Sequence, residues 1–315
     1  MTRRELLKSL LIPAGISWAG LVSRSQTRRR RPVRNAAAGP LKSERVGVSS
    51  WSFRNFFYAT RDAATPTSAP TLALLDFPEM IADRYKVHNL ELAARHFASI
   101  EPAYLLELKS SLLRARSRLI NLAVDVRELE SGGGLSDPQA DARENAIAVT
   151  KRWIDIARQL GARAVSCDPG SADPGNLQAT IDSFRQLAAY GRTKGVAILV
   201  ENRTAAGASY FDAPVSICRG IGGTSIGALP SFGNFPDDAA RMHDLPAFFG
   251  YAHTICHATG LKLDASGNET AFNFPQCVQI AQKGGFRGIY SVNYEGAADP
   301  YPATQNVINE LLRLL

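Results

Sequence analysis

The chain has 315 residues, of which 45% are hydrophobic, and its mean hydropathy of −0.11 is typical of a globular protein with a large core. Its net charge of +7 does not indicate nucleic-acid binding, because residues 1–45 hold eleven basic and two acidic residues, a net charge of +9. The other 25 basic and 27 acidic residues leave the remainder at −2, whereas a protein that binds phosphate backbones needs positive charge on its folded surface.

The first 40 residues resemble a twin-arginine export signal. Residues 2–8 contain the pair Arg3-Arg4, residues 10–22 are apolar but too few for a membrane span, and residues 36–38 are alanines suited to cleavage. We therefore expect residues 1–40 to be an export signal with a basic linker. The protein would be exported, and its mature form would have no stable membrane span. A cytosolic protein with a basic amphipathic tail is the alternative.

From residue 45 onward, strand-like apolar runs alternate with helix-like segments. The expected strands are 46–53, 88–92, 118–126, 164–170, 196–201, 225–230, 252–257 and 288–296. The expected helices are 74–85, 102–117, 137–160, 177–190, 213–219, 239–249, 274–283 and 303–315. Eight such units predict a single (β/α)8 TIM barrel over residues 45–315. A doubly wound sheet is the alternative, but no nucleotide-binding glycine motif is present, so no nucleotide cofactor is expected.

Turn-forming residues mark the ends of two predicted helices. Asp137 and Pro138 are expected to open the third helix as its N-cap and first helical residue. Gly161 and Gly195 are expected to end the third and fourth helices.

The four cysteines are widely spaced and match no metal-binding pattern. They are Cys167, Cys218, Cys256 and Cys277. We expect buried thiols rather than a disulfide framework.

Glu201 is the residue on which the predicted site is centred. It follows the apolar run 196–200 and precedes Asn202 and Arg203. Chemistry in parallel barrels lies at the carboxyl ends of the strands, so a carboxylate at this position indicates a functional group. The alternative is that Glu201 only caps the next helix.

Five short motifs lie at the ends of predicted strands. They are VSSWSF at 48–53, LEL at 90–92, VEN at 200–202, PSFGNF at 230–235 and YEG at 294–296. Together they resemble the xylose isomerase-like TIM barrel superfamily of sugar phosphate isomerases and epimerases, over residues 45–310. The resemblance implies a divalent metal held by Glu, Asp, His and Glu, with two carboxylates that move a proton beside a sugar carbonyl.

Carried onto this sequence, the resemblance places the four metal ligands at Glu201, Ser231, His257 and Asn293. Ser231 and Asn293 stand where the family has Asp and Glu, and Arg203 stands where many members have His. Two neutral side chains in place of carboxylates weaken a site for Mn, Zn, Co or Mg. The change at position 293 also removes one of the two proton-transfer carboxylates, while Glu295 matches the outer glutamate of the family.

Three hypotheses follow for the site, with Glu201, His257 and Glu295 as the catalytic candidates. In the first, Glu295 joins Glu201, His257 and His253 in a rebuilt metal site. In the second, the enzyme works without metal, with Arg203 as electrophile and Glu201 and His257 as base and acid. In the third, the barrel binds a carbohydrate without catalysis. For both His253 and His257, a histidine of the core with ordinary hydrogen-bond partners is the competing interpretation.

Several side chains are candidates for substrate binding. They are Trp51, Phe53, Glu91, Arg203, Asn234 and Asn293. Trp51 and Phe53 would stack on a sugar ring or else belong to the core. Glu91 and Asp125 would bind sugar hydroxyls or pair with a nearby arginine such as Arg95.

The expected function is isomerisation, epimerisation or a related enolisation or elimination of a sugar or sugar-derived polyol. A free or glycosidic sugar is favoured over a phosphate ester, because no cluster of cations follows the predicted strands. Abasic-site endonucleases share this fold but use a larger set of His and acidic ligands, and the chain has only five His. A small-molecule sugar is thus the expected partner, and nucleic acid is not.

Overall fold

Eight short apolar segments form parallel strands in the computed structural model, which describes residues 41–63, 68, 70–126, 129, 134–202 and 212–315. The strands are β1 (Val46–Ser49), β2 (Asn89–Ala93), β3 (Arg118–Val124), β4 (Ala164–Cys167), β5 (Ala197–Glu201), β6 (Ile226–Leu229), β7 (Ile255–Gly260) and β8 (Ile289–Tyr294). Each overlaps a predicted strand, and β2 and β7 extend past the predicted ends at residues 92 and 257. Residues 1–40, where the sequence predicts an export signal, lie outside the described residues.

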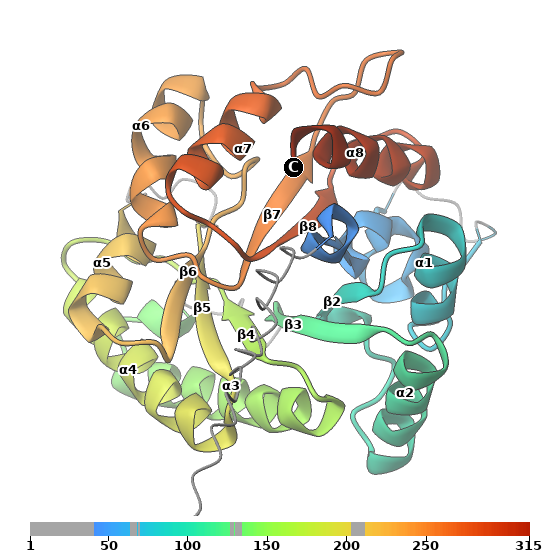
Figure 1. The fold of residues 1–315 in the computed structure, drawn as a ribbon. Coiled ribbons are helices and arrows are strands. Elements are labelled where there is room, and N and C mark those ends of the chain that lie inside the picture. The colour runs from blue at the N-terminus through green and yellow to red at the C-terminus, as the bar shows by residue number, and fades with distance from the viewer. Residues whose placement is uncertain (1–40, 64–67, 69, 127–128, 130–133, 203–211) are drawn as a thin grey trace, which may run out of the picture. The chain divides into compact units, whose positions relative to one another are not determined.

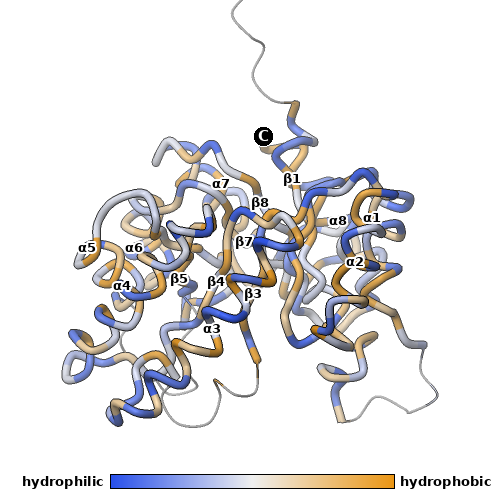
Figure 2. The backbone as a smooth tube through the Cα atoms, turned by 90° about the horizontal axis from the view of Figure 1, so that it is seen from below, coloured by the Kyte–Doolittle hydropathy of each residue, from blue (hydrophilic) through white to orange (hydrophobic). Residues whose placement is uncertain are grey.

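A helix follows each strand and lies outside the barrel (Figure 1). The helices are α1 (Phe77–Tyr85), α2 (Pro102–Arg114), α3 (Ala140–Leu160), α4 (Leu177–Lys194), α5 (Ala213–Ile221), α6 (Asp238–Phe249), α7 (Phe274–Lys283) and α8 (Pro300–Leu314). Hydrophobic and hydrophilic residues alternate along them (Figure 2), as expected for helices that bury one face. None of the described helices is long and apolar enough to cross a membrane.

The helix ends show where local sequence signals hold and where they fail. Gly161 and Gly195 end α3 and α4 with φ of +85° and +68°, so the predicted glycine caps are confirmed. The predicted start of α3 is wrong: the helix begins at Ala140 after Gln139. The carboxylate of Asp137 instead accepts a hydrogen bond from Gln139 N at 2.8 Å, which forms a turn before the helix.

The strand order β6-β5-β4-β3-β2-β1-β8-β7 follows the chain around the sheet. The last gap is closed by a parallel bridge between Ser231 and His257, where His257 N donates to Pro230 O at 2.8 Å and Phe232 N donates to His257 O at 3.1 Å. This order confirms the (β/α)8 barrel and excludes the doubly wound sheet. Pro40–Leu315 forms one compact unit.

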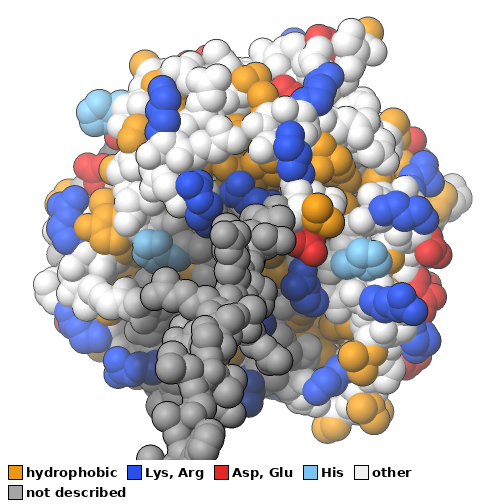
Figure 3. All heavy atoms as spheres, in the orientation of Figure 1, with side chains coloured by type: hydrophobic (Ala, Val, Ile, Leu, Met, Phe, Trp, Pro, Cys, Tyr) orange, Lys and Arg blue, Asp and Glu red, His pale blue; other side chains and the backbone are white. Residues whose placement is uncertain are grey.

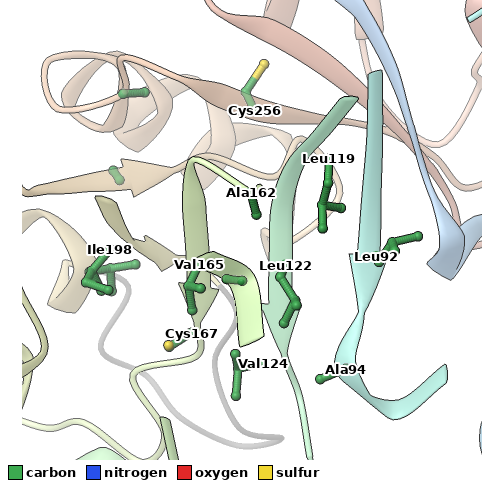
Figure 4. Close-up of a cluster of buried hydrophobic side chains, with 14 of the residues drawn as sticks. Leu92, Ala94, Leu119, Leu122, Val124, Ala162, Val165, Cys167, Ile198 and Cys256 are labelled. Carbon is green, nitrogen blue, oxygen red and sulfur yellow. The ribbon is translucent and has the colours of Figure 1, made fainter. Parts of the chain in front are cut away.

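Two apolar layers hold the barrel together. The larger lies between strands and helices and includes Leu122, Val165 and Ile198 from neighbouring strands (Figure 4). The smaller, formed by Ala164, Leu199, Leu229 and Ile255 from β4 to β7, fills the barrel interior. Because side chains alternate along a strand, Glu201 and His257 point to the same side as Leu199 and Ile255, two residues farther on. The interior therefore changes from apolar to polar toward the carboxyl ends.

Most charged side chains lie on the surface of the folded unit (Figure 3), and its cysteine thiols are buried. Lys and Arg side chains are spread over the face shown in Figure 3, with Asp and Glu among them at its edges. The four cysteines are all free and buried, which confirms the prediction of buried thiols.

Candidate active site

A small cavity of about 40 Å³ opens among the carboxyl ends of the strands. Its lining is Ser49, Trp51, Glu91, Ala93, Ala123, Val124, Asp125, Ser166, Asp168, Glu201, His257, Asn293 and Glu295. The structure thus brings together six of the site residues predicted from sequence: Trp51, Glu91, Glu201, His257, Asn293 and Glu295. They come from five different strands or from the residues that follow them, which is how this barrel gathers functional groups.

His257, in the middle of β7, is held by the buried carboxylate of Glu91 from β2. His257 Nε2 lies 2.9 Å and 3.1 Å from the two carboxylate oxygens, and the two side chains are 5% and 1% exposed. Glu91 also accepts hydrogen bonds from Asn121 Nδ2 at 2.8 Å and from Ser291 Oγ at 2.7 Å. Both oxygens of this carboxylate are therefore occupied by groups of the protein.

We expected Glu91 to bind sugar hydroxyls or to pair with Arg95, and the structure gives it a different place. Instead, Glu91 is held by Ser291 and orients the imidazole of His257. Arg95 instead donates to the backbone oxygen of Asp125 at 2.6 and 2.9 Å, and its guanidinium lies 3.9 Å from the carboxylate of Asp125. The alternative of an arginine pair thus holds for Asp125.

The second ring nitrogen of His257 faces Glu201. His257 Nδ1 lies 3.4 Å from Glu201 Oε1, without the geometry of a hydrogen bond. Burial lowers the pKa of His257, but the charges and contacts of Glu91 and Glu201 outweigh it and raise this pKa to about 10. At neutral pH His257 is a cation between two carboxylates. The Glu201 side chain keeps 12% of its surface exposed, so it is the member of this group that a ligand can reach.

Asn202 and Asn234 fix the end of β5 to the end of β6. Asn202 Nδ2 donates to Ser231 O at 3.1 Å, and Ser231 N donates to Asn202 Oδ1 at 2.6 Å. Asn234 Nδ2 donates to Glu201 Oε1 at 3.3 Å. Asn234, predicted to contact substrate, therefore contacts the central carboxylate and does not line the cavity.

Asn293 and Glu295 form a second polar pair, at the end of β8. Asn293 Nδ2 donates to Glu295 Oε1 at 2.7 Å. The Asn293 side-chain oxygen is buried without a hydrogen-bond partner among the described residues. A buried amide oxygen in that state is satisfied when a ligand or water donates to it.

The two predicted aromatic contacts have different positions. Trp51 lines the cavity and stacks on His96 with ring centroids 5.8 Å apart, and His96 stacks on Phe57 at 3.9 Å. Phe53 is fully buried and packs edge-on against Phe77, with centroids 5.9 Å apart. The alternative of a core residue therefore holds for Phe53, because residues 50–56 coil into a 3-10 helix that turns it away from the cavity.

Two further predicted residues do not join the site. His253 is exposed and precedes the first residue of β7, at the opposite end of that strand from the cavity, so it is neither a core histidine nor within reach of Glu201. Arg203 lies outside the described residues.

Sequence reasoning missed several residues of the site. They are Ser49, His96, Asn121, Ser166, Asp168 and Ser291. Alternation within the strands carries the signal for some of them, because a small polar residue at every second position of an apolar strand marks the barrel interior.

The sequence of residues 90–313 matches the xylose isomerase-like TIM barrel family. The chain belongs to this family. No curated protein sequence matches it closely enough to add to this assignment.

Solved structures of low sequence identity share the fold. One is a xylose isomerase-like barrel protein from Mycobacterium smegmatis in complex with magnesium, 15% identical with a TM-score of 0.60 over 85% of this chain and 95% of that one. A second is D-psicose 3-epimerase from Clostridium cellulolyticum with D-tagatose, 14% identical with a TM-score of 0.61 over 86% and 96%. A third is 3-keto-D-glucoside 4-epimerase from E. coli, 15% identical with a TM-score of 0.58 over 85% and 98%.

The side chains of this family member do not fit a resident divalent metal. Of the four ligand positions, Glu201 alone is a carboxylate, and His257 is held between two carboxylates. Ser231 directs its hydroxyl to Thr259 at 3.0 Å, and Asn293 is neutral. Across the described parts of the chain, no three His, Cys, Asp or Glu side chains are grouped so that they could hold a metal ion. The four ligand positions supply only one carboxylate, and such a donor set suits Mg²⁺ or Mn²⁺ poorly.

Proposed function

We propose that this protein binds a small uncharged sugar or keto-sugar at the barrel mouth and moves a proton on a carbon next to its carbonyl. The observation that carries the proposal is Glu201, a partly exposed carboxylate that faces the buried His257 cation across 3.4 Å. Isomerase and epimerase structures with this fold support the same substrate class. The low identity to them leaves the sugar itself to experiment.

The roles follow from what each group can do. Glu201 is the group to accept a proton from a substrate carbon. The positive charge of His257, oriented by Glu91, favours the negative charge that develops on the substrate oxygen during enolisation. Glu295, which follows β8, also lines the cavity and is the candidate to return a proton. Its partner Asn293 offers an unpaired acceptor for a sugar hydroxyl.

The charge of the cavity supports a neutral ligand. The described lining contains five carboxylic acids and one histidine. They are Glu91, Asp125, Asp168, Glu201 and Glu295, with His257. Such a lining repels phosphate esters and sugar acids. An uncharged polyol, whose hydroxyls donate hydrogen bonds to carboxylates, fits it.

Proton exchange in heavy water tests the reaction directly. Incubation with a panel of keto-sugars in D2O should replace hydrogen by deuterium beside the carbonyl, followed by proton NMR. Glu201→Gln should reduce this exchange at least 100-fold while sugar binding persists. Glu107→Gln, which changes an exposed residue of α2, is the matched control and should leave exchange unchanged.

A carbohydrate-binding barrel without catalysis is the second candidate, favoured by the neutral Asn293 at one proton-transfer position. Sugars that raise the melting temperature without any deuterium exchange would support it. Neither exchange nor a melting shift with any sugar would contradict both candidates.

We also propose that the first 40 residues direct export. The arginine pair and the apolar segment that follows it support this. Arg3→Lys together with Arg4→Lys should retain the protein in the cytoplasm, measured by cell fractionation and immunoblotting. The pair Arg28→Lys and Arg29→Lys, in the basic tract, is the control, and equal export of both variants would contradict the proposal.

A further inference from the structure

Ser231 occupies the position of an aspartate ligand but has become part of the packing. Its side chain is fully buried, and its hydroxyl lies 3.0 Å from the equally buried hydroxyl of Thr259. Its backbone N–H and C=O both pair with the Asn202 amide, which fixes this strand end. The hydroxyl therefore has a partner within the protein and brings no charge to the cavity.

Asn293 occupies the position of the second glutamate ligand and is oriented by its neighbour. Glu295 accepts its amide N–H at 2.7 Å, which leaves the amide oxygen buried and unpaired. A neutral amide oxygen suits a hydroxyl donor of an organic ligand, whereas a divalent cation gains far more from a carboxylate.

Only one of the four positions therefore carries a negative charge, compared with three in a Glu-Asp-His-Glu set. That one, Glu201, has its Oε1 3.4 Å from His257 Nδ1, and His257 Nε2 lies 2.9 Å from Glu91 Oε1. The imidazole of His257 is therefore already held by side chains of the protein.

From these contacts we infer that the barrel mouth holds no resident divalent cation, and that positions 231 and 293 have changed from metal ligands into hydrogen-bonding positions. Asn293 presents its amide oxygen to the ligand. The inference rests on the proposed function only for the location of the site, since its readout is metal content and not turnover.

Restoring both carboxylates tests this assignment. The full chain and the variant Ser231→Asp/Asn293→Glu are purified, loaded with excess MnCl2, passed through a desalting column and measured by elemental analysis. Calorimetric titration with MnCl2 gives the affinity of each. Wild type is expected to retain less than a tenth of an equivalent of manganese. The double variant should retain close to one and bind Mn²⁺ at least ten-fold more tightly.

The control makes the same two chemical changes away from the cavity. Ser99→Asp/Asn309→Glu alters a loop before α2 and an exposed position of α8, and should bind no more manganese than wild type. Circular dichroism shows whether each variant is folded.

Two results would overturn the inference. One is a full equivalent of metal in wild type that disappears in Glu201→Gln. The other is a folded Ser231→Asp/Asn293→Glu variant with no gain in manganese. Failure of the sugar reaction would leave the metal measurement unaffected, so the two proposals fail separately.

Discussion

His257 is a buried cation inside the barrel, and its neighbours offset the free energy that burial of its charge costs. Burial of an isolated charge is costly, and it is offset here by two carboxylates from strands that are distant in sequence. Asn121 and Ser291 complete the hydrogen bonds of Glu91, so that no oxygen of that carboxylate remains without a donor. The arrangement stabilises one orientation of the imidazole ring.

The raised pKa of His257 predicts a loss of stability at alkaline pH. Its folded-state pKa of about 10 exceeds the ordinary value of about 6.5, so the stabilisation is fully present below pH 6.5 and disappears as the pH rises through 10. Urea unfolding between pH 6.5 and 10 should show the free energy of unfolding of wild type falling by up to about 1.4 kcal/mol per pH unit relative to His257→Gln. Parallel curves for the two proteins would contradict a buried cation.

Removing the carboxylate that orients His257 should lower the free energy of unfolding much more than removing a surface carboxylate. Glu91→Gln leaves the His257 cation short of a partner and should lower the free energy of unfolding by about 3 kcal/mol. Glu79→Gln breaks a pair with Arg114 whose side chains are 48% and 60% exposed, and should cost less than about 1 kcal/mol. Equal urea midpoints for both variants would show that the buried pair of Glu91 and His257 adds no more to the stability of the protein than the surface pair does.

At the scale of elements, apolar runs and glycine caps made the eight strand and helix units predictable. The ends of the strands were less predictable, and the two errors in predicting them have physical causes. Residues 50–53 alternate serine with aromatic residues as a strand would, yet they coil into a 3-10 helix, which buries Phe53 and exposes Trp51 to the cavity. Residues 252–254 precede β7 rather than begin it, so His253 stays outside at the far end.

The joint between α4 and β5 requires a residue without a side chain at position 191. A Cβ there would lie 2.5 Å from Val196 O, a backbone atom that cannot move freely. Gly191→Ala should therefore destabilise the protein by about 2 kcal/mol or more, measured by urea unfolding. Gly195→Ala meets no atom within 4 Å and should cost only about 1 kcal/mol from its φ of +68°. A smaller effect at position 191 than at 195 would contradict this packing.

At the scale of the whole molecule, the site depends on closure of the barrel. Glu91 and His257 are 166 positions apart, and their strands are separated by β1 and β8 in the sheet. Glu201 could be found from sequence because it ends a buried strand. The pairing of His257 with Glu91 could not, because it exists only after the sheet curls and both side chains point inward.

The seam between β6 and β7 should be the first part of the barrel to open. It is held by a single isolated bridge at Ser231 and His257, whereas β7 and β8 are paired over six residues. Hydrogen exchange followed by NMR should show faster exchange for the amides of Phe232 and His257 than for that of Leu122 on β3. Slower exchange at the seam would contradict this order of opening.

Alkylation of the four buried cysteines can report local unfolding of the protein. Burial raises the pKa of each thiol, to about 12 for Cys218 and Cys277, so native thiols resist alkylation. Cys256 lies directly before His257 on β7, and Cys167 ends β4. The rate at which iodoacetamide modifies each cysteine, resolved by mass spectrometry, would thus report how fast the strand or helix that carries it opens. No added label is needed.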